Sequence, residues 1–147
     1  MKIRIEEEPS LEEAEVVIRC RPGDSQAARL LAVLGELQPA RKLTGTREGQ
    51  TYLLDTGEVL YIDTVDKRTF LYTREAVYES ELRLYELEAR LKGQDFFRAS
   101  KSALVNFNAI QSLRPDLGGR LRLTMQGGEA VYVSRQYAPG LKERLGL

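Results

Sequence analysis

The sequence contains no histidine, no tryptophan and a single cysteine among its 147 residues. Without histidine, the chain forms no Ser-His-Asp or Cys-His catalytic unit, no HExxH zinc site and no histidine proton shuttle. One cysteine, Cys20, excludes an intrachain disulfide, a zinc ribbon and an iron–sulfur cluster. No apolar run approaches the roughly 18–20 residues of a membrane-spanning helix, and the first ten residues lack a signal-peptide core. We therefore expect a cytoplasmic protein.

An excess of one charge is also lacking, because 22 Lys and Arg residues balance 22 Asp and Glu residues. The balance conceals a gradient. Residues 1–40 have 5 basic and 8 acidic side chains, whereas residues 94–147 have 8 basic and 4 acidic ones. A basic last third on a neutral protein is typical of a nucleic-acid-binding face. Chance produces a gradient this mild as well, so charge alone leaves the function open.

The chain does contain short β patterns and a few amphipathic helices. Residues 2–5 and 16–18 predict two strands, and Asp24 or Ser25 is expected to cap a helix. The apolar stripe of that helix recurs at helical spacing: Ala27, Leu30, Leu31, Leu34 and Leu37. Residues 1–40 therefore predict a β-β-α extension, too small to fold alone, that ends in a polar connector over residues 40–50.

The β pattern dominates the rest of the chain. Residues 52–54 and 59–62 predict one hairpin, and residues 121–124 and 130–133 predict another. Residues 63–68 are expected to form a charged loop before a strand at 69–73. Two helices complete the prediction, one with a stripe at Leu84, Leu87 and Leu91 and one near the C-terminus with Leu141 and Leu145.

Candidate catalytic groups are few. Asp63 and Asp66 have no third and fourth metal ligand at a recognisable spacing, so a hydrolase that uses them is the weakest hypothesis. Cys20 follows a β-branched segment and is interpreted as a small core residue. The glycine pairs do not fit a phosphate-binding loop. We predict no enzyme activity, no cofactor, no metal and no small-molecule substrate.

The best local constellation lies at the start of the basic third. Arg98, Ser100, Lys101 and Ser102 bring two cations and two hydroxyls together, which suits the oxygens of a phosphate group. Arg135 begins a second candidate segment behind the strand at 130–133. A solvated loop with a capping serine fits the same residues equally well.

These residues resemble the LytTR family. The run from Phe96 to Asn106, FFRASKSALVN, is similar to the family signature F-x-R-x-[HS]-[KR]-S-x-x-V-N. Further marks follow in the same order as in the family: Ile110, Gly128-Glu129, the SR-x-Y segment at residues 134–137 and the LK-x-x-L segment at residues 141–145. Upstream, residues 59–63 resemble its I-x-Y-I-E strand and residues 85–91 its helix. The resemblance covers about residues 44–147.

The resemblance implies a mainly β (α+β) domain over residues 44–147, made of elongated antiparallel sheets with short helices. It also implies that loops of this scaffold enter the major groove of double-stranded DNA. The family's base-contacting positions fall on the loop of Asp66, Lys67 and Arg68, on Lys101 and on Arg135. Ser100 stands where many members have histidine. Because proline suits the first turn of a helix and breaks its interior, the last helix is expected to begin near Pro139.

The sequence therefore predicts a bacterial, sequence-specific transcription regulator that binds double-stranded DNA. The predicted DNA-binding residues are Lys67, Arg68, Arg98, Ser100, Lys101, Ser102 and Arg135. We also expect a homodimer, with residues 1–40 serving packing or dimerisation. The alternative is a protein–protein adaptor on the same β scaffold, which salt dependence distinguishes because DNA binding by cations weakens steeply as salt rises.

Overall fold

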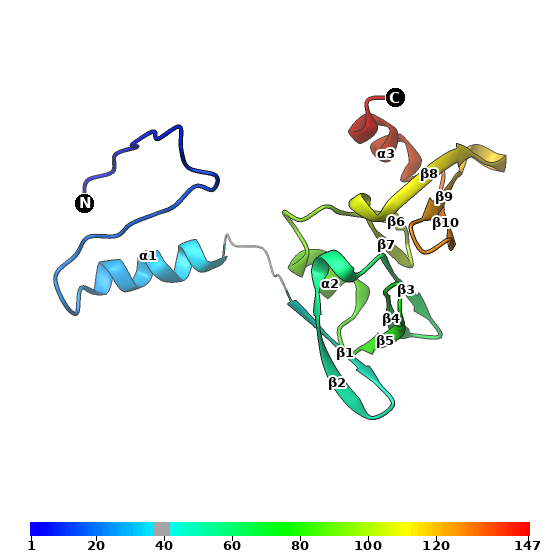
Figure 1. Ribbon diagram of the computed structural model, residues 1–147, viewed down its shortest axis with the longest axis horizontal. Coiled ribbons are helices and arrows are strands. Elements are labelled where there is room, and N and C mark those ends of the chain that lie inside the picture. The colour runs from blue at the N-terminus through cyan, green and yellow to red at the C-terminus, as the bar shows by residue number, and fades with distance from the viewer. Residues whose placement is uncertain (37–41) are drawn as a thin grey trace. The chain divides into compact units, whose positions relative to one another are not determined.

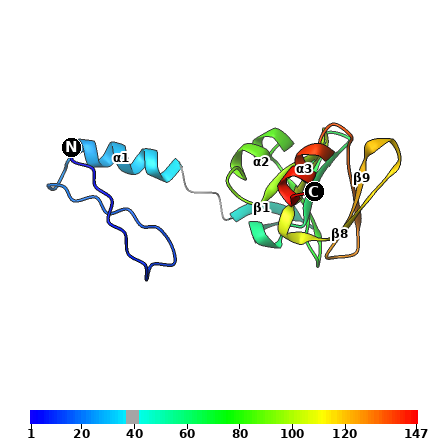
Figure 2. The ribbon, with the colours of Figure 1, turned by 90° about the horizontal axis from the view of Figure 1, so that it is seen from above.

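The protein is described here by a computed structural model of residues 1–36 and 42–147 (Figure 1). The chain forms two units, Met1–Gln38 and Pro39–Leu147. Figures 1 and 2 show a helix in the first unit and a β-rich domain in the second.

In the N-terminal unit the only described regular element is α1, Ser25–Glu36. The side chain of Asp24 caps it, because its Oδ1 accepts hydrogen bonds from the amides of Gln26 and Ala27 at 2.8 and 3.2 Å. The two strands predicted at residues 2–5 and 16–18 are wrong, since residues 1–24 contain neither helix nor strand. A strand needs a hydrogen-bonded neighbour, and the described residues supply none here.

Two further expectations for this unit need correction. Cys20 is exposed, so its interpretation as a core residue is wrong. The stripe of α1 is only partly covered: Ala27 is buried and Leu30 and Leu34 are half-buried, whereas Leu31 is 64% exposed. Leu37 lies outside the described residues. Within this unit, α1 therefore packs through a narrow face.

A seven-stranded antiparallel sheet, sheet A, forms most of the domain. Its spatial order is β2-β1-β5-β4-β3-β7-β6. The strands are β1 Lys42–Arg47, β2 Gln50–Asp55, β3 Tyr61–Val65, β4 Arg68–Tyr72, β5 Val77–Ser80, β6 Phe96–Ser100 and β7 Ala103–Asn106.

The start of sheet A differs from the sequence prediction. Residues 40–50 were expected to be a connector, but β1 occupies residues 42–47 and pairs with β2. The predicted hairpin of residues 52–54 with 59–62 is wrong, because β3 pairs with β4 and β7 instead. The tight turn is at Glu48 and Gly49, both with positive φ, so the chain reverses before residue 52 rather than after it.

A second, three-stranded sheet, sheet B, has the order β10-β9-β8 and contains β8 Ile110–Pro115, β9 Leu121–Met125 and β10 Ala130–Val133. Its β9–β10 hairpin confirms the one predicted from the sequence. The helices of the domain are α2, Leu84–Arg90, and α3, Ala138–Leu145. Pro139 lies in the first turn of α3, as its chemistry predicts.

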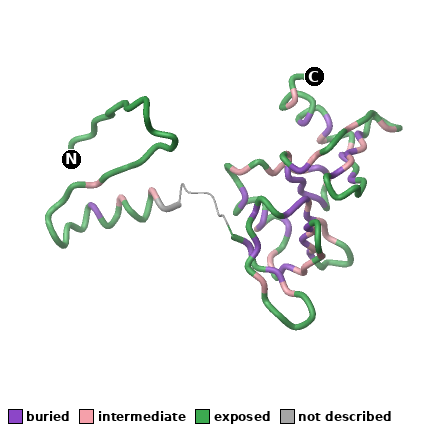
Figure 3. Tube along the Cα trace, in the orientation of Figure 1, coloured by how far each residue is buried: buried purple, intermediate pink, exposed green. Residues whose placement is uncertain are grey.

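Two apolar clusters form the core, which Figure 3 shows as buried segments. One joins sheet A to α2 through Ile62, Leu71, Leu87 and Leu104, and the other joins β6 and β7 to sheet B and α3 through Val105, Leu123, Val133 and Leu141. The predicted mainly β class with short helices is confirmed for this domain. All four residues of β7 are buried, and its side chains enter both clusters, so this strand gives the turn beside it a rigid base.

Candidate nucleic-acid interface

Three turns that are far apart in the sequence lie at one edge of the domain. They are the β3–β4 turn (Asp66 and Lys67), the β6–β7 turn (Lys101 and Ser102) and the β10–α3 turn (residues 134–137). The amide of Thr64 in β3 donates to the carbonyl of Ser102 at 2.9 Å. The amide of Ser134 donates to the carbonyl of Ala99 in β6 at 2.8 Å. These backbone bonds join the three turns into one surface, the three-turn edge.

The β3–β4 turn is shorter than predicted. Residues 63–68 were expected to form a charged loop, but β3 continues to Val65 and β4 begins at Arg68. Only Asp66 and Lys67 remain between the strands, with φ of 50° and 65°. Positive φ at both positions is the geometry of a tight hairpin turn that normally selects glycine or asparagine. Lys67 is held in this strained conformation with its side chain exposed.

Arg68 lies beside this turn but is already paired. Its Nε and Nη2 donate to the two carboxylate oxygens of Glu79 at 2.9 and 2.7 Å, and its guanidinium lies 5.3 Å from the Phe70 ring centre. This bidentate pair lowers the pKa of Glu79 and raises that of Arg68. The guanidinium is therefore partly neutralised before any ligand arrives.

The β6–β7 turn is ordered by its own side chains. The Oγ of Ser100 accepts a hydrogen bond from the amide of Ser102 at 3.2 Å and lies 3.4 Å from the Ser102 Oγ. Lys101, between them, is exposed at the tip. The serines thus fix the turn, and Lys101 extends from it.

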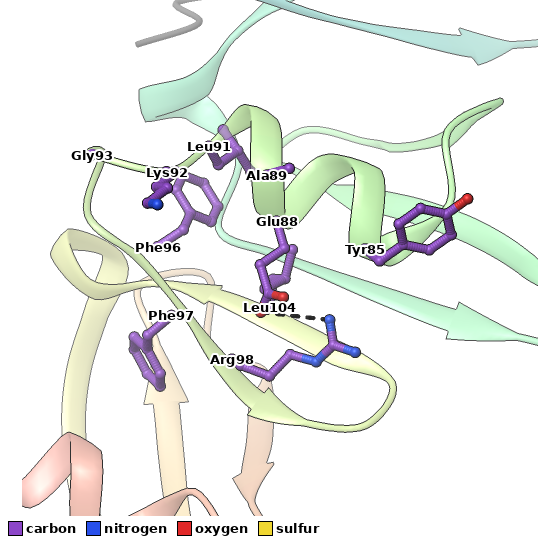
Figure 4. A pocket seen from close by; sticks show the side chains of 10 residues that line it. All are labelled: Tyr85, Glu88, Ala89, Leu91, Lys92, Gly93, Phe96, Phe97, Arg98 and Leu104. Atoms are coloured by element: carbon purple, nitrogen blue, oxygen red, sulfur yellow. Dashed lines mark ion pairs between the residues drawn. The ribbon is translucent and has the colours of Figure 1, made fainter. Parts of the chain in front are cut away.

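Arg98 supports this turn from behind. Its Nε donates to the carbonyl of Ser100 at 2.8 Å, and its Nη2 donates to the carbonyl of Lys101 at 3.1 Å. Figure 4 shows the same guanidinium pointing to Glu88 of α2, whose Oε2 lies 3.6 Å from Nη1. Only 23% of the Arg98 side chain is exposed. The sequence indicated a phosphate-binding cation at this position, whereas the geometry is that of a brace between α2 and the turn.

Arg135 reaches the three-turn edge over a glycine. A Cβ built on Gly119, in the β8–β9 turn, would lie 2.9 Å from the Cγ of Arg135 and 3.0 Å from its Cδ. Gly119 has a φ of 80°, so both its backbone and its lack of a side chain are required here. Sequence reasoning identified Gly119 only as a turn residue, because its contact with Arg135 depends on the pairing of β9 with β10.

The cations of this region fall into two groups. Lys67, Lys101 and Arg135 are exposed, and none of their side chains makes an ion pair or hydrogen bond with another described residue. Arg68 and Arg98 are bound to carboxylates or carbonyls. The structure thus brings all seven predicted residues to one edge, but only three of them present free positive charge.

Two carboxylates near this edge, Asp63 and Asp66, lie in β3 and in the turn that follows it. Burial raises the pKa of Asp63, and a hydrogen bond from Tyr72 acts in the opposite direction. Burial also raises the pKa of Tyr61, to about 12, and that of Tyr72, and the two rings stack at 4.2 Å. Asp66 is exposed in the turn. Within residues 1–36 and 42–147, no group of three or more acidic or cysteine side chains is placed to hold a metal ion.

Comparison with known proteins agrees with this geometry. The family described as LytTr DNA-binding domain matches residues 49–146. The chain is similar to an uncharacterized HTH-type transcriptional regulator of Staphylococcus aureus (strain bovine RF122 / ET3-1), with 30% identity over 118 residues and 80% of each chain covered. A regulator of the same description from strain NCTC 8325 / PS 47 is 29% identical over the same length, again with 80% of each chain covered.

A solved structure is similar as well. The LytTr DNA-binding domain of a Bacillus cereus protein superposes with a TM-score of 0.70 at 29% identity, covering 74% of this chain and 99% of that one. The helices described here are too short or too polar to cross a bilayer. Together these findings confirm the DNA-binding regulator predicted from the sequence and do not favour the adaptor alternative. The chain belongs to the LytTR family of DNA-binding domains.

Proposed function

We propose that the protein reads specific base pairs in the major groove with Lys67, Lys101 and Arg135, one cation from each turn of the three-turn edge. The observation that carries this proposal is that the three side chains share the same exposed, unpaired state. All three are exposed and lack a protein counter-charge among the described residues, whereas their neighbours are paired. Cations most often read guanine through its O6 and N7 atoms, which face the major groove.

The remaining predicted residues have supporting roles in this proposal. Ser100 and Ser102 fix the β6–β7 turn, and their hydroxyls would donate to phosphate oxygens of bound DNA. Arg98 positions Lys101 through the two turn carbonyls. Arg68, bound to Glu79, adds little to binding. Base reading therefore depends on turns that are rigid before DNA binds, which lowers the ordering cost of association.

Selection of bound duplexes from a random DNA library tests this proposal. We expect a defined sequence to be enriched, with an affinity that falls steeply as salt rises, since each neutralised phosphate releases a counterion. A matched control is Arg90→Gln, an exposed arginine at the end of α2, which should enrich the same sequence. Enrichment of no sequence, or binding that is insensitive to salt, would contradict the proposal and favour the adaptor.

We further propose that the protein works as a cytoplasmic homodimer on repeated sites and that residues 1–38 serve assembly rather than base reading. Exposed Leu31 and the half-buried Leu30 and Leu34 leave apolar surface on α1. The acidic character of this segment also disfavours contact with DNA.

This role is tested by light scattering, which gives the number of protomers in each particle. The samples are the full chain, free and bound to DNA, and a variant that lacks residues 1–38. The expected result is two full-length protomers per selected duplex and a lower dimer fraction after truncation, with the same half-site sequence. A changed half-site after truncation would show that the extension contacts bases. A stoichiometry of one full-length protomer per duplex would contradict the proposed homodimer.

A further inference from the structure

Sheet B has an outer face that the three-turn edge does not include. Its outward positions are Ser112, Arg114, Arg122, Thr124, Ala130 and Tyr132, whereas the alternate positions of the same strands enter the core. None of the six is acidic. We call this surface the sheet B outer face.

Two arginines lie directly opposite each other on this face. The register pairs Arg114 of β8 with Arg122 of β9, and Arg122 in turn with Tyr132 of β10. Like charges at directly opposed positions of a sheet destabilise it. Packing of the core does not require charged residues at these two positions, because they lie on the outward side of the strands. The arrangement therefore indicates a surface that is complementary to negative charge.

One of these guanidinium groups also has an unused donor. The Nε of Arg122 is buried and has no hydrogen-bond partner among residues 1–36 and 42–147. Buried donors are almost always paired in folded proteins, and an unpaired one costs free energy. An anionic acceptor that approaches the face and draws the Arg122 side chain outward would satisfy this donor and offset the repulsion by Arg114.

A third arginine links the outer face to the three-turn edge. The guanidinium of Arg120 lies 5.1 Å from the ring centre of Tyr132, which is 45% exposed. It also pairs with Asp116 at 2.7 Å. Arg120 directly follows Gly119, the glycine against which the stem of Arg135 packs. The outer face is therefore continuous in space with Arg135 through Gly119, Arg120 and Tyr132, although Asp116 partly neutralises Arg120 itself.

We infer that the sheet B outer face binds the phosphate backbone of the same DNA beyond the base pairs read by the three-turn edge. The inference rests on the proposed function, because it takes DNA at that edge as given. Charge complementarity requires an anionic occupant, and continuity with Arg135 at the three-turn edge favours DNA over an acidic protein. The contact contributes affinity and footprint length but not sequence preference, since phosphates carry no base information.

Two duplexes with the same selected sequence test the inference, one ending at the edges of that sequence and one extended by about ten base pairs, roughly one helical turn, on each side. For Arg114→Gln and Arg122→Gln we expect affinity for the long duplex to fall roughly 3–10-fold, and the salt slope to fall by about one unit per arginine. Affinity for the short duplex should stay at the wild-type value. Arg90→Gln is the control and should change neither.

Thermal unfolding shows whether each variant is folded. Because Arg114 is exposed, Arg114→Gln still tests the inference if Arg122→Gln is unstable.

The outcomes separate this inference from the proposed function. If the wild-type protein enriches no DNA sequence, the proposed function itself is contradicted. Specific wild-type binding together with unchanged affinity of both variants for the long duplex overturns only the inference. Equal losses on the short and long duplexes would also overturn it, by moving the arginines into the reading site. Unchanged DNA affinity combined with reduced retention on immobilised polyglutamate would instead assign the face to an acidic protein.

Discussion

The turns of the three-turn edge and the strands behind them carry the same type of side chain in different states. Lys67, Lys101 and Arg135 on the turns are exposed and unpaired within the described chain. Arg68 and Arg98 on the strands are held by Glu79, by Glu88 and by two backbone carbonyls. A cation that already has a partner must lose it before it gains a phosphate or a base. Proximity to the interface is therefore a poor guide to a cation's role, and its existing partners are a better one.

The largest expected effect comes from removing unpaired cations. Lys101→Ala and Arg135→Ala should each reduce discrimination between selected and random DNA by roughly 1–3 kcal/mol, and the double variant by about the sum, because each side chain reads a base edge. Arg68→Gln is the matched control, and its effect on discrimination should be close to zero. Competition binding of the selected duplex against random DNA measures this ratio. Equal losses on both DNAs would make Lys101 and Arg135 phosphate contacts.

An intermediate effect is expected at the brace. Arg98→Gln removes the fork that joins Glu88 to the carbonyls of Ser100 and Lys101. It should lower the free energy of unfolding by roughly 1–3 kcal/mol, as expected for hydrogen bonds to a charged group. It should also reduce affinity for the selected duplex by more than Arg68→Gln does.

Arg98→Lys separates charge from geometry in this prediction. Lysine keeps the positive charge but lacks the planar fork. If Arg98 positions the turn, the lysine variant will resemble the glutamine variant in its discrimination between selected and random DNA. Full recovery of wild-type binding by lysine would make Arg98 a simple phosphate contact.

The smallest effect concerns pH. The pKa of Asp63 is raised by burial, so the folded state binds this proton more tightly than the unfolded state does. The free energy of unfolding should therefore fall as pH rises from the unfolded aspartate pKa of about 4 through the raised value. Asp63→Asn should abolish that component, as measured by denaturant unfolding between about pH 3 and pH 7. A wild-type curve parallel to that of the variant would show that Asp63 does not titrate in this way.

The sequence predicted the parts of the fold that depend on local pattern. The helix with its stripe at Leu84, Leu87 and Leu91, the hairpin of residues 121–124 with 130–133 and the start of the last helix near Pro139 follow from periodicity, turn residues and proline chemistry. The β1–β2 hairpin was missed because residues 42–47 are mostly polar, and their strand conformation depends on pairing with β2. The predicted strands at residues 2–5 and 16–18 have strand composition but no neighbour, and Ile3 and Ile5 are 83% and 88% exposed.

The candidate site was predictable to a similar degree. The charge gradient and the resemblance located Lys67, Lys101 and Arg135, and the structure brings their turns together. The difference between free and paired cations was not predictable, because Glu79 and Glu88 come from other elements of the chain. The same limit applies to Arg114 and Arg122, which face each other only through the register of β8 and β9.

The most direct test of the central claim is dimethyl sulfate protection of guanine N7 on the selected duplex, because this atom lies in the major groove where the three cations are proposed to bind. Wild-type protein should protect a small set of guanines. Lys67→Ala, Lys101→Ala and Arg135→Ala should each restore methylation at a different member of that set, whereas Arg68→Gln should restore none. Guanines that stay protected in all three alanine variants, or a wild-type complex that protects no guanine N7, would contradict the account.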